Sequence, residues 1–132
     1  MTGRRRPLVV AADDEPDAVR LVELCLTRAD IDVVTAPDGA RALALIRSQS
    51  PDACVLDVAM PRLGGLDVVR LLRKDPATRA LPVMLLTAAA RPADEESGRG
   101  AGADAYLTKP FSPSELVECV RALIGAAGGW SA

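Results

Sequence analysis

The sequence predicts an α/β fold in which helices connect the strands of a parallel sheet. Short apolar runs alternate with stretches of helical periodicity five times along the chain, which is the pattern of strands joined by crossover helices. Four of these runs end at carboxylate, hydroxyl or ammonium side chains, which can bind ligands or take part in reactions. The 132 residues fit one domain, which we place at 7–125 between short tails at 1–6 and 126–132.

The first half of the chain holds three of the apolar runs, at 8–12, 31–36 and 53–56. Pro16 suits a first helical turn, so a helix should follow the first run. Its face against the sheet is predicted to consist of Ala18, Leu21, Val22, Cys25 and Leu26. A turn at 37–39 precedes a second helix, which ends near Ser48 and has an inner face of Ala42, Leu43 and Ile46.

The second half continues the alternation. A loop over 58–65 leads into a helix that carries Leu66, Val69 and Leu72, and further strands are predicted at 81–86 and 105–108. Ser112 and Glu115 have the spacing of a capping box, with Pro113 in the first helical turn. These residues begin the last predicted helix, which is followed by a tail of small residues. The apolar face of this helix consists of Leu116, Cys119, Val120, Leu123 and Ile124.

The fourth helix breaks the pattern. Residues 91–102 offer no apolar side chain larger than alanine, and glycine at positions 98 and 100 costs about 1 kcal/mol each relative to alanine inside a helix. We therefore expect a short, frayed or mobile helix here, with Gly102 as its stop signal.

Composition limits the functional classes. The 16 Lys and Arg residues nearly balance 18 Asp and Glu residues, so there is no reason to expect nucleic acid or an anionic membrane as a partner. No apolar stretch approaches the roughly 20 residues that cross a bilayer. An odd number of widely spaced cysteines predicts reduced thiols and a cytoplasmic location.

Polar residues follow four of the predicted strands. Asp13 and Asp14 come after the first run, Asp57 after the third, Thr87 after the fourth and Lys109 after the fifth. The carboxyl ends of parallel strands line the ligand-binding crevice of an open sheet, so these side chains should converge. Three carboxylates suit a hard divalent cation such as Mg²⁺, with Mn²⁺ as an alternative.

The same set could support phosphoryl transfer. Beside a dication and Lys109, Asp57 would stay ionised and could attack phosphorus to form an acyl phosphate. Cation, ammonium and the Thr87 hydroxyl would each partner one equatorial oxygen. Taken singly, the acids could instead be helix N-terminal or turn residues, Thr87 a backbone partner and Lys109 a solvated loop residue.

Across residues 7–125 the chain resembles a receiver domain of a two-component response regulator. The resemblance rests on four stretches in order: 8–16 with its acidic Asp13-Asp14-Glu15, 56–65 around Asp57 and Pro61, 82–88, and 102–111 with Lys109-Pro110-Phe111. It implies a flavodoxin-like fold of three layers, with a doubly wound five-stranded parallel sheet in the order 2-1-3-4-5. It also implies a bacterial signalling protein rather than an enzyme.

The resemblance further implies that Asp57 accepts a phosphoryl group from a histidine kinase or phosphotransfer protein. Asp14, Asp57 and the carbonyl of Ala59 would bind Mg²⁺ directly, with Asp13 acting mainly through water. Lys109 would pair with the phosphoryl group, and its bond to Pro110 would be cis.

Two residues would then act as a switch. Thr87 would move toward the phosphoryl group and Tyr106 would rotate inward behind it, changing the face formed by the fourth helix, fifth strand and fifth helix. A downstream protein would bind that face, and the chain would be a monomer or a phosphorylation-dependent dimer. Alanine at positions 59 and 89 would neither shield the acyl phosphate nor activate water.

Three functional hypotheses follow. The leading one is a stand-alone signalling module, because no DNA-binding or enzymatic domain follows the last predicted helix. A metal-dependent phosphohydrolase using Asp57 is a second, although Ala59 stands where a second acid would be needed. A scaffold independent of phosphorylation is the third. A nucleotide-binding loop is absent after the first run.

Overall fold

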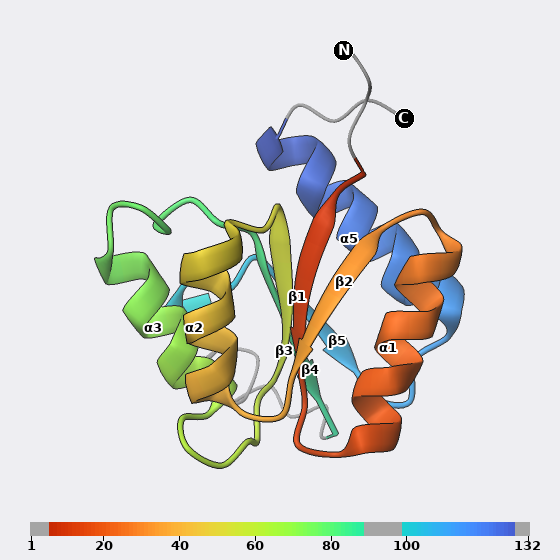
Figure 1. Cartoon of the computed structure of the whole chain (residues 1–132), viewed down its shortest axis with the longest axis horizontal. Coiled ribbons are helices and arrows are strands. Elements are labelled where there is room, and N and C mark those ends of the chain that lie inside the picture. Colours follow the sequence, from red (N-terminus) through yellow and green to blue (C-terminus); the bar gives the residue numbers. More distant parts are fainter. Residues whose placement is uncertain (1–5, 89–98, 129–132) are drawn as a thin grey trace.

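The computed structural model describes residues 6–88 and 99–128 and contains a five-stranded parallel sheet. The strand order is β2-β1-β3-β4-β5, as the resemblance implied (Figure 1). All five predicted runs form strands, namely β1 (Leu8–Ala12), β2 (Asp32–Ala36), β3 (Ala53–Asp57), β4 (Val83–Thr87) and β5 (Ala105–Thr108).

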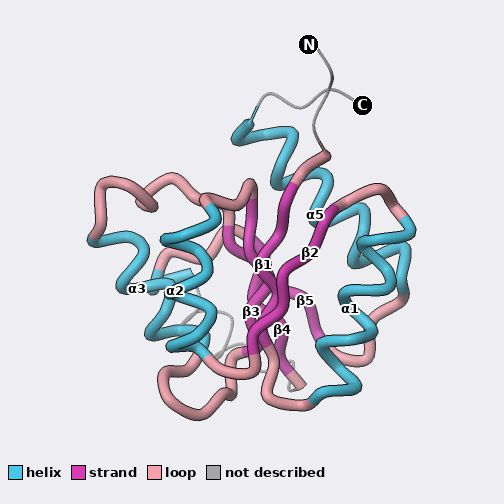
Figure 2. The backbone as a smooth tube through the Cα atoms, viewed as in Figure 1, coloured by secondary structure: helices cyan, strands magenta, loops and turns pink. Residues whose placement is uncertain are grey.

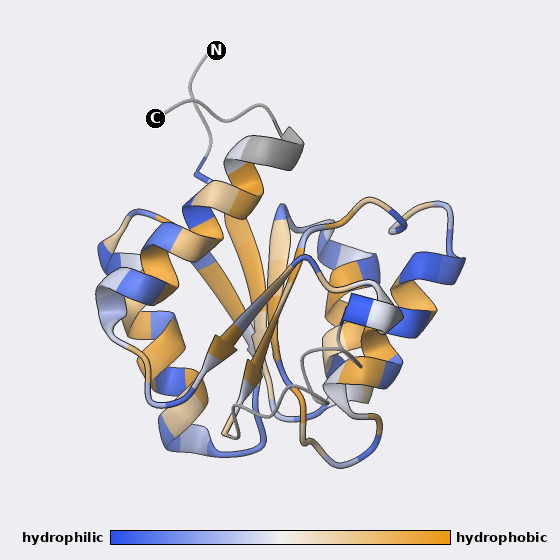
Figure 3. Cartoon of the chain, turned by 180° about the vertical axis from the view of Figure 1, so that it is seen from behind, coloured by the Kyte–Doolittle hydropathy of each residue, from blue (hydrophilic) through white to orange (hydrophobic). Residues whose placement is uncertain are grey.

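Helices cover both faces of the sheet and give the predicted three layers. On one face lie α1 (Pro16–Arg28) and α5 (Pro113–Gly128), and on the other lie α2 (Gly39–Gln49) and α3 (Gly65–Lys74) (Figures 1 and 2). Each pair closes its own aliphatic cluster against the sheet. Coloured by hydropathy, the strands are apolar over most of their length while the helices present polar outer sides (Figure 3).

The predicted apolar face of α1 is wrong at one position. Val22, Cys25 and Leu26 are buried as expected, but Leu21 is 47% exposed. The buried stripe is completed instead by Val19, which packs against the same cluster. At about 100° per residue, Leu21 lies roughly 90° from the centre of the face formed by Val22, Cys25 and Leu26, on the side away from Val19, and so falls at the solvent margin of the helix.

Local caps explain where two helices begin. The Asp38 side chain accepts a hydrogen bond of 2.8 Å from the Arg41 N–H and so caps α2. The predicted capping box of α5 is confirmed by reciprocal bonds between Ser112 and Glu115, of 2.9 and 3.1 Å. However, α5 continues to Gly128, past the predicted tail boundary, because the alanines after Gly125 favour helix.

The fourth-helix segment is described only at its end. Residues 99–101 are helical and the chain turns at Gly102, whose φ of 107° confirms it as the stop. The expectation of a short, frayed or mobile helix over 91–102 falls largely on residues 91–98, which lie outside the described residues. Cys25, Cys54 and Cys119 are all free thiols, as predicted.

Candidate functional site at the carboxyl edge of the sheet

Strand register brings the predicted site residues to one edge of the sheet. Ala12 of β1 lies beside Leu56 of β3, so Asp13 and Asp57 follow neighbouring positions. Two backbone bonds extend the pairing past the strand ends, from Val58 N to the Leu86 carbonyl at 2.9 Å and from Lys109 N to the Thr87 carbonyl at 2.7 Å. The loops that carry the polar side chains therefore start from fixed positions.

Lys109 joins the two buried carboxylates. Its Nζ lies 2.7 Å from Asp13 Oδ2 and 3.0 Å from Asp57 Oδ1. Asp13 and Asp57 are only 2% and 7% exposed, so these contacts are shielded from solvent. The Asp13 carboxylate also accepts a bond of 3.0 Å from the Glu15 N–H, which fixes its orientation.

The three acids form a cluster that fits a divalent cation. One carboxylate oxygen from each of Asp13, Asp14 and Asp57 lies within 4.8 Å of the others. Asp14 is exposed whereas the other two are buried, so the cluster opens to solvent on one side. An oxygen-only donor set with one open side is the kind of site that Mg²⁺ prefers, because that ion keeps several of its waters.

Electrostatics support the same reading. Burial raises the pKa of Asp57 above its usual 3.8, the hydrogen bond from Lys109 opposes this, and the charges of Asp13 and Asp14 add to the rise. Burial alone would lower the pKa of Lys109, but its hydrogen bonds to Asp13 and Asp57 outweigh that effect and raise it. Lys109 is therefore charged at neutral pH, and a second cation would favour the ionised form of Asp57.

The remaining predicted residues lie around this cluster. Thr87 is buried at the end of β4, opposite Thr108 of β5. Tyr106 is half-buried on β5 beside Leu85, two residues before Thr87, and the Lys109–Pro110 bond is cis as expected. Ala59 is exposed in the loop after Asp57, and position 89 lies outside the described residues.

Sequence reasoning did not single out the contact between Asp38 and Arg62. The Arg62 guanidinium lies 3.6 Å from Asp38 Oδ2, which joins the loop after Asp57 to the start of α2. The sequence carries only a weak signal for this contact, because its pattern places Asp38 in a turn and Arg62 in a loop. Their proximity depends on how β2 and β3 are placed on either side of β1.

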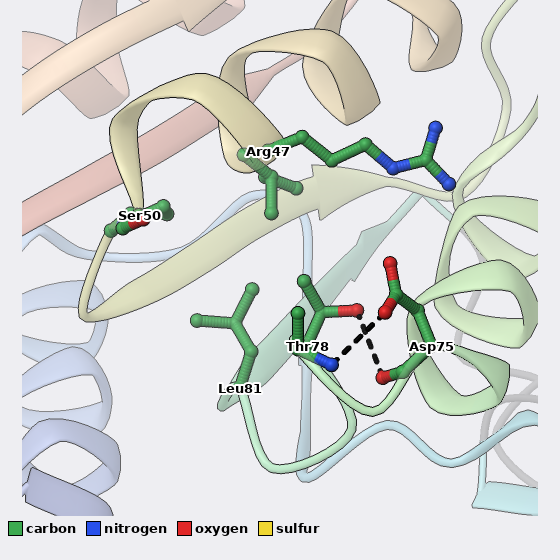
Figure 4. Close-up of a pocket in the computed structure, with 8 residues that line it drawn as sticks. Arg47, Ser50, Asp75, Thr78 and Leu81 are labelled. Carbon is green, nitrogen blue, oxygen red and sulfur yellow. Dashed lines mark hydrogen bonds between the residues drawn. The ribbon is translucent and has the colours of Figure 1, made fainter.

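A cavity of about 290 Å³ lies at the opposite edge of the sheet (Figure 4). Its polar lining includes Arg47 and Asp75, and the Thr78 N–H donates a bond of 3.0 Å to the Asp75 carbonyl. Asp75 Oδ1 also accepts a bond of 2.9 Å from the Ala77 N–H. These bonds shape the loop after α3, and the cavity adjoins none of the three clustered acids.

Comparison with known proteins gives one family. A model described as the response regulator receiver domain matches residues 9–121. The chain is 43% identical over 120 residues to TcrX of Mycobacterium tuberculosis, named a probable transcriptional regulatory protein, covering 91% of this chain and 50% of that protein. It is 40% identical over 116 residues to the alkaline phosphatase synthesis transcriptional regulatory protein PhoP of Bacillus subtilis, covering 88% and 48% respectively.

Solved structures agree. The receiver domain of Francisella response regulator 1452 superposes with a TM-score of 0.86 at 35% identity, covering 92% of this chain and 98% of that one. The chemotaxis protein CheY4 of Vibrio cholerae gives a TM-score of 0.85 at 30% identity, covering 89% and 98%.

The chain spans about half the length of the curated relatives it matches. No helix within residues 6–88 and 99–128 is long and apolar enough to cross a membrane. With the 2-1-3-4-5 sheet and the acid cluster at its carboxyl edge, these matches identify the chain as a member of the response regulator receiver domain family of two-component signalling.

Proposed function

We propose that Asp57 is the phosphoacceptor of this receiver and that Lys109 and a divalent cation support the transfer. The observation that carries the proposal is the position of the Lys109 ammonium, 3.0 Å from Asp57 Oδ1 and 2.7 Å from Asp13 Oδ2. It places a positive charge beside the buried Asp57 carboxylate, while the exposed Asp14 leaves another side of the cluster open to solvent. A phosphoryl group attached to the Asp57 carboxylate would therefore lie next to the Lys109 ammonium.

The chemistry is an in-line displacement. A carboxylate oxygen of Asp57 forms a bond to phosphorus while the bond from phosphorus to the donor nitrogen of a phosphohistidine breaks, leaving a neutral histidine after protonation. Lys109 stabilises negative charge on one equatorial oxygen, and the Thr87 hydroxyl lies on the neighbouring strand to serve another. In this role the chain acts as a signalling phosphoacceptor and not as an enzyme with an external substrate.

The cation would be held by the residues of the cluster. Asp14 and Asp57 would supply carboxylate oxygens, Ala59 a backbone carbonyl, and Asp13 would act mainly through water. When bound, Mg²⁺ or Mn²⁺ supplies charge that neutralises the phosphoryl oxygens. The acids fit this role because they offer only hard oxygen donors and because Asp14 keeps one side open.

Output would follow from Thr87 and Tyr106. The register places Thr87 two residues beyond the β4 neighbour of Tyr106, so a shift of the hydroxyl toward a phosphoryl group would change the space available to the ring. The face that would respond comprises β5, α5 and the helix that ends at residue 101. Its partner would be a downstream protein or a second copy of the chain, and the donor a histidine kinase or phosphotransfer protein.

The test uses a small phosphoryl donor. The protein is incubated with acetyl phosphate with and without Mg²⁺, and its intact mass is read for wild type, Asp57→Asn and the control Asp67→Asn, whose carboxylate is exposed on α3. We expect one Mg²⁺-dependent phosphoryl group in wild type and in the control, and none in Asp57→Asn. Equal labelling of all three proteins would refute Asp57 as the acceptor.

Rapid hydrolysis could hide the adduct in a mass measurement. Release of inorganic phosphate from acetyl phosphate is therefore followed in parallel. If wild type gives neither adduct nor Mg²⁺-dependent phosphate release, the phosphoacceptor proposal is wrong.

A further inference from the structure

The loop after Asp57 is attached to the beginning of α2 by three contacts. The Ala40 N–H donates a bond of 3.0 Å to the Arg62 carbonyl. The Arg62 guanidinium lies 3.6 Å from Asp38 Oδ2, while the other oxygen of Asp38 caps α2. The first N–H groups of a helix have no partner within it, so Ala40 is available to hold the loop without disturbing α2.

The third contact is a close approach of two backbones. A Cβ atom built on Gly39 would lie 1.9 Å from the Leu63 carbonyl oxygen and 2.8 Å from its carbon. Both obstacles are main-chain atoms, so no flexible side chain can move aside. Gly39 is buried at this crossing, and any other residue would push the loop and α2 apart.

The loop also adopts a conformation that requires support. Arg62 and Leu63 have φ values of 51° and 99°, a region that residues with a Cβ rarely occupy. Two successive residues of this kind persist only where surrounding contacts fix them. The contacts with Asp38, Gly39 and Ala40 are located at these two residues.

The other end of the loop is fixed as well. Val58 donates to the Leu86 carbonyl at 2.9 Å, and Gly65 donates to the Val58 carbonyl at 3.0 Å. Between this anchor and the one on α2 lie only Ala59, Met60 and Pro61, and the proline ring restricts its own φ. The direction of the Ala59 carbonyl is thus set by both anchors.

We infer that the N-terminus of α2 positions the Ala59 carbonyl for the divalent cation, with Gly39 as the positioning residue that allows the loop to lie against the helix. This inference rests on the proposed function, because it needs a cation at the acid cluster. It adds a support that lies on a different element from every proposed ligand.

The first test is the variant Gly39→Ala, with Gly100→Ala as a matched control. A Cβ on Gly100 meets nothing within 4 Å, so the control adds the same methyl group in open space. Mg²⁺ affinity is measured by titration followed through backbone amide NMR signals, and folding is checked by circular dichroism. Gly39→Ala should bind Mg²⁺ about tenfold more weakly, the loss usual for residues that orient metal ligands, and the control should match wild type.

A second measurement needs no variant and applies even if Gly39→Ala fails to fold. If the docked loop favours Mg²⁺ binding, then Mg²⁺ binding must favour the docked loop to the same extent. Hydrogen exchange of the Ala40 amide, which holds the Arg62 carbonyl, should therefore slow when wild type is saturated with Mg²⁺. Exchange of Ala40 that is unchanged by Mg²⁺ would overturn the inference.

The outcomes separate the two proposals. Wild type that binds no Mg²⁺ contradicts the proposed function and this inference with it. Wild type that binds Mg²⁺ while folded Gly39→Ala binds it within about twofold contradicts the positioning role alone, since orienting residues have larger effects.

Discussion

The Arg73 guanidinium donates a bond of 2.9 Å to the carboxylate of Asp104, 31 residues further along the chain. The same Asp104 oxygen accepts a bond of 2.9 Å from the Val83 N–H at the start of β4. Arg73 also donates to four backbone carbonyls at 2.8 to 3.4 Å, those of Thr78, Arg79, Leu81 and Gly102. One side chain thus joins α3, the loop before β4 and the turn before β5.

Replacing Arg73 by alanine should therefore lower the free energy of unfolding by about 2–4 kcal/mol, because bonds from a charged donor are lost and several carbonyls lose a partner. Arg70→Ala is the control, since Arg70 lies on the same helix but is half exposed and forms an ion pair with Asp67 on the helix surface. It should change stability by no more than about 0.5 kcal/mol. Urea unfolding of both variants measures the two changes in the free energy of unfolding. Equal changes would contradict the central role of Arg73.

Lys109 should stabilise the fold as well as the site. In Lys109→Met the carboxylates of Asp13 and Asp57 lose their shared cation, and both are buried. Removing one partner of a buried ion pair costs several kcal/mol, and the partial exposure of Lys109 reduces our expectation to about 1–3 kcal/mol at neutral pH without Mg²⁺. Urea unfolding with EDTA measures the loss. The loss of stability in Lys109→Met should become smaller when Mg²⁺ is added. A loss that does not depend on Mg²⁺ would argue against a cation at these acids.

Asp57 should destabilise the folded state when it is ionised. Its pKa is raised above 3.8, mainly by burial, so folding favours the protonated form. No penalty exists below pH 3.8, and the penalty grows as the pH rises from there through the raised pKa. Asp57→Asn lacks this ionisation, and the other carboxylates are common to both proteins.

The stability advantage of Asp57→Asn over wild type in EDTA should accordingly increase as the pH rises above 3.8 and level off once the pH has passed the raised pKa of Asp57. Urea unfolding across this range gives the difference at each pH. An advantage that stays constant or decreases with rising pH would show that the Asp57 pKa is not raised. Lys109 stays charged throughout, because its own pKa lies above 10.5.

Local sequence patterns predicted most of the fold and also predicted that the site residues lie close together. The apolar runs became strands, and the Ser112–Glu115 box began α5, because each depends on residues close in sequence. Asp57 and Lys109 could be placed together because parallel strands share a carboxyl edge.

What failed required tertiary information. Leu21 fitted an apolar stripe by spacing, yet the sheet contacts a narrower face of α1 and leaves that side chain exposed. No local sequence signal marks Arg73, because its partner Asp104 is distant in sequence. The left-handed conformation at Arg62 had no signal either, since glycine or asparagine would normally mark it.

That conformation leads to a last prediction. Arg62 has a φ of 51°, its side chain is 79% exposed, and its contact with Asp38 is 3.6 Å. The left-handed region costs an ordinary residue about 1–2 kcal/mol, while glycine adds about 0.4–1 kcal/mol of flexibility to the unfolded chain. Arg62→Gly should therefore raise the free energy of unfolding by about 0.5–1 kcal/mol, net of a weak surface ion pair.

Arg62→Ala removes the same side chain but keeps the strained φ, so it should leave stability unchanged or slightly lower. The quantity to measure is the difference between the two variants in urea unfolding, which isolates the backbone effect from the lost contact with Asp38. If glycine is no better than alanine at this position, the loop does not hold Arg62 in the left-handed region in solution. The attachment of the loop to α2 through the Arg62 carbonyl would then also need revision.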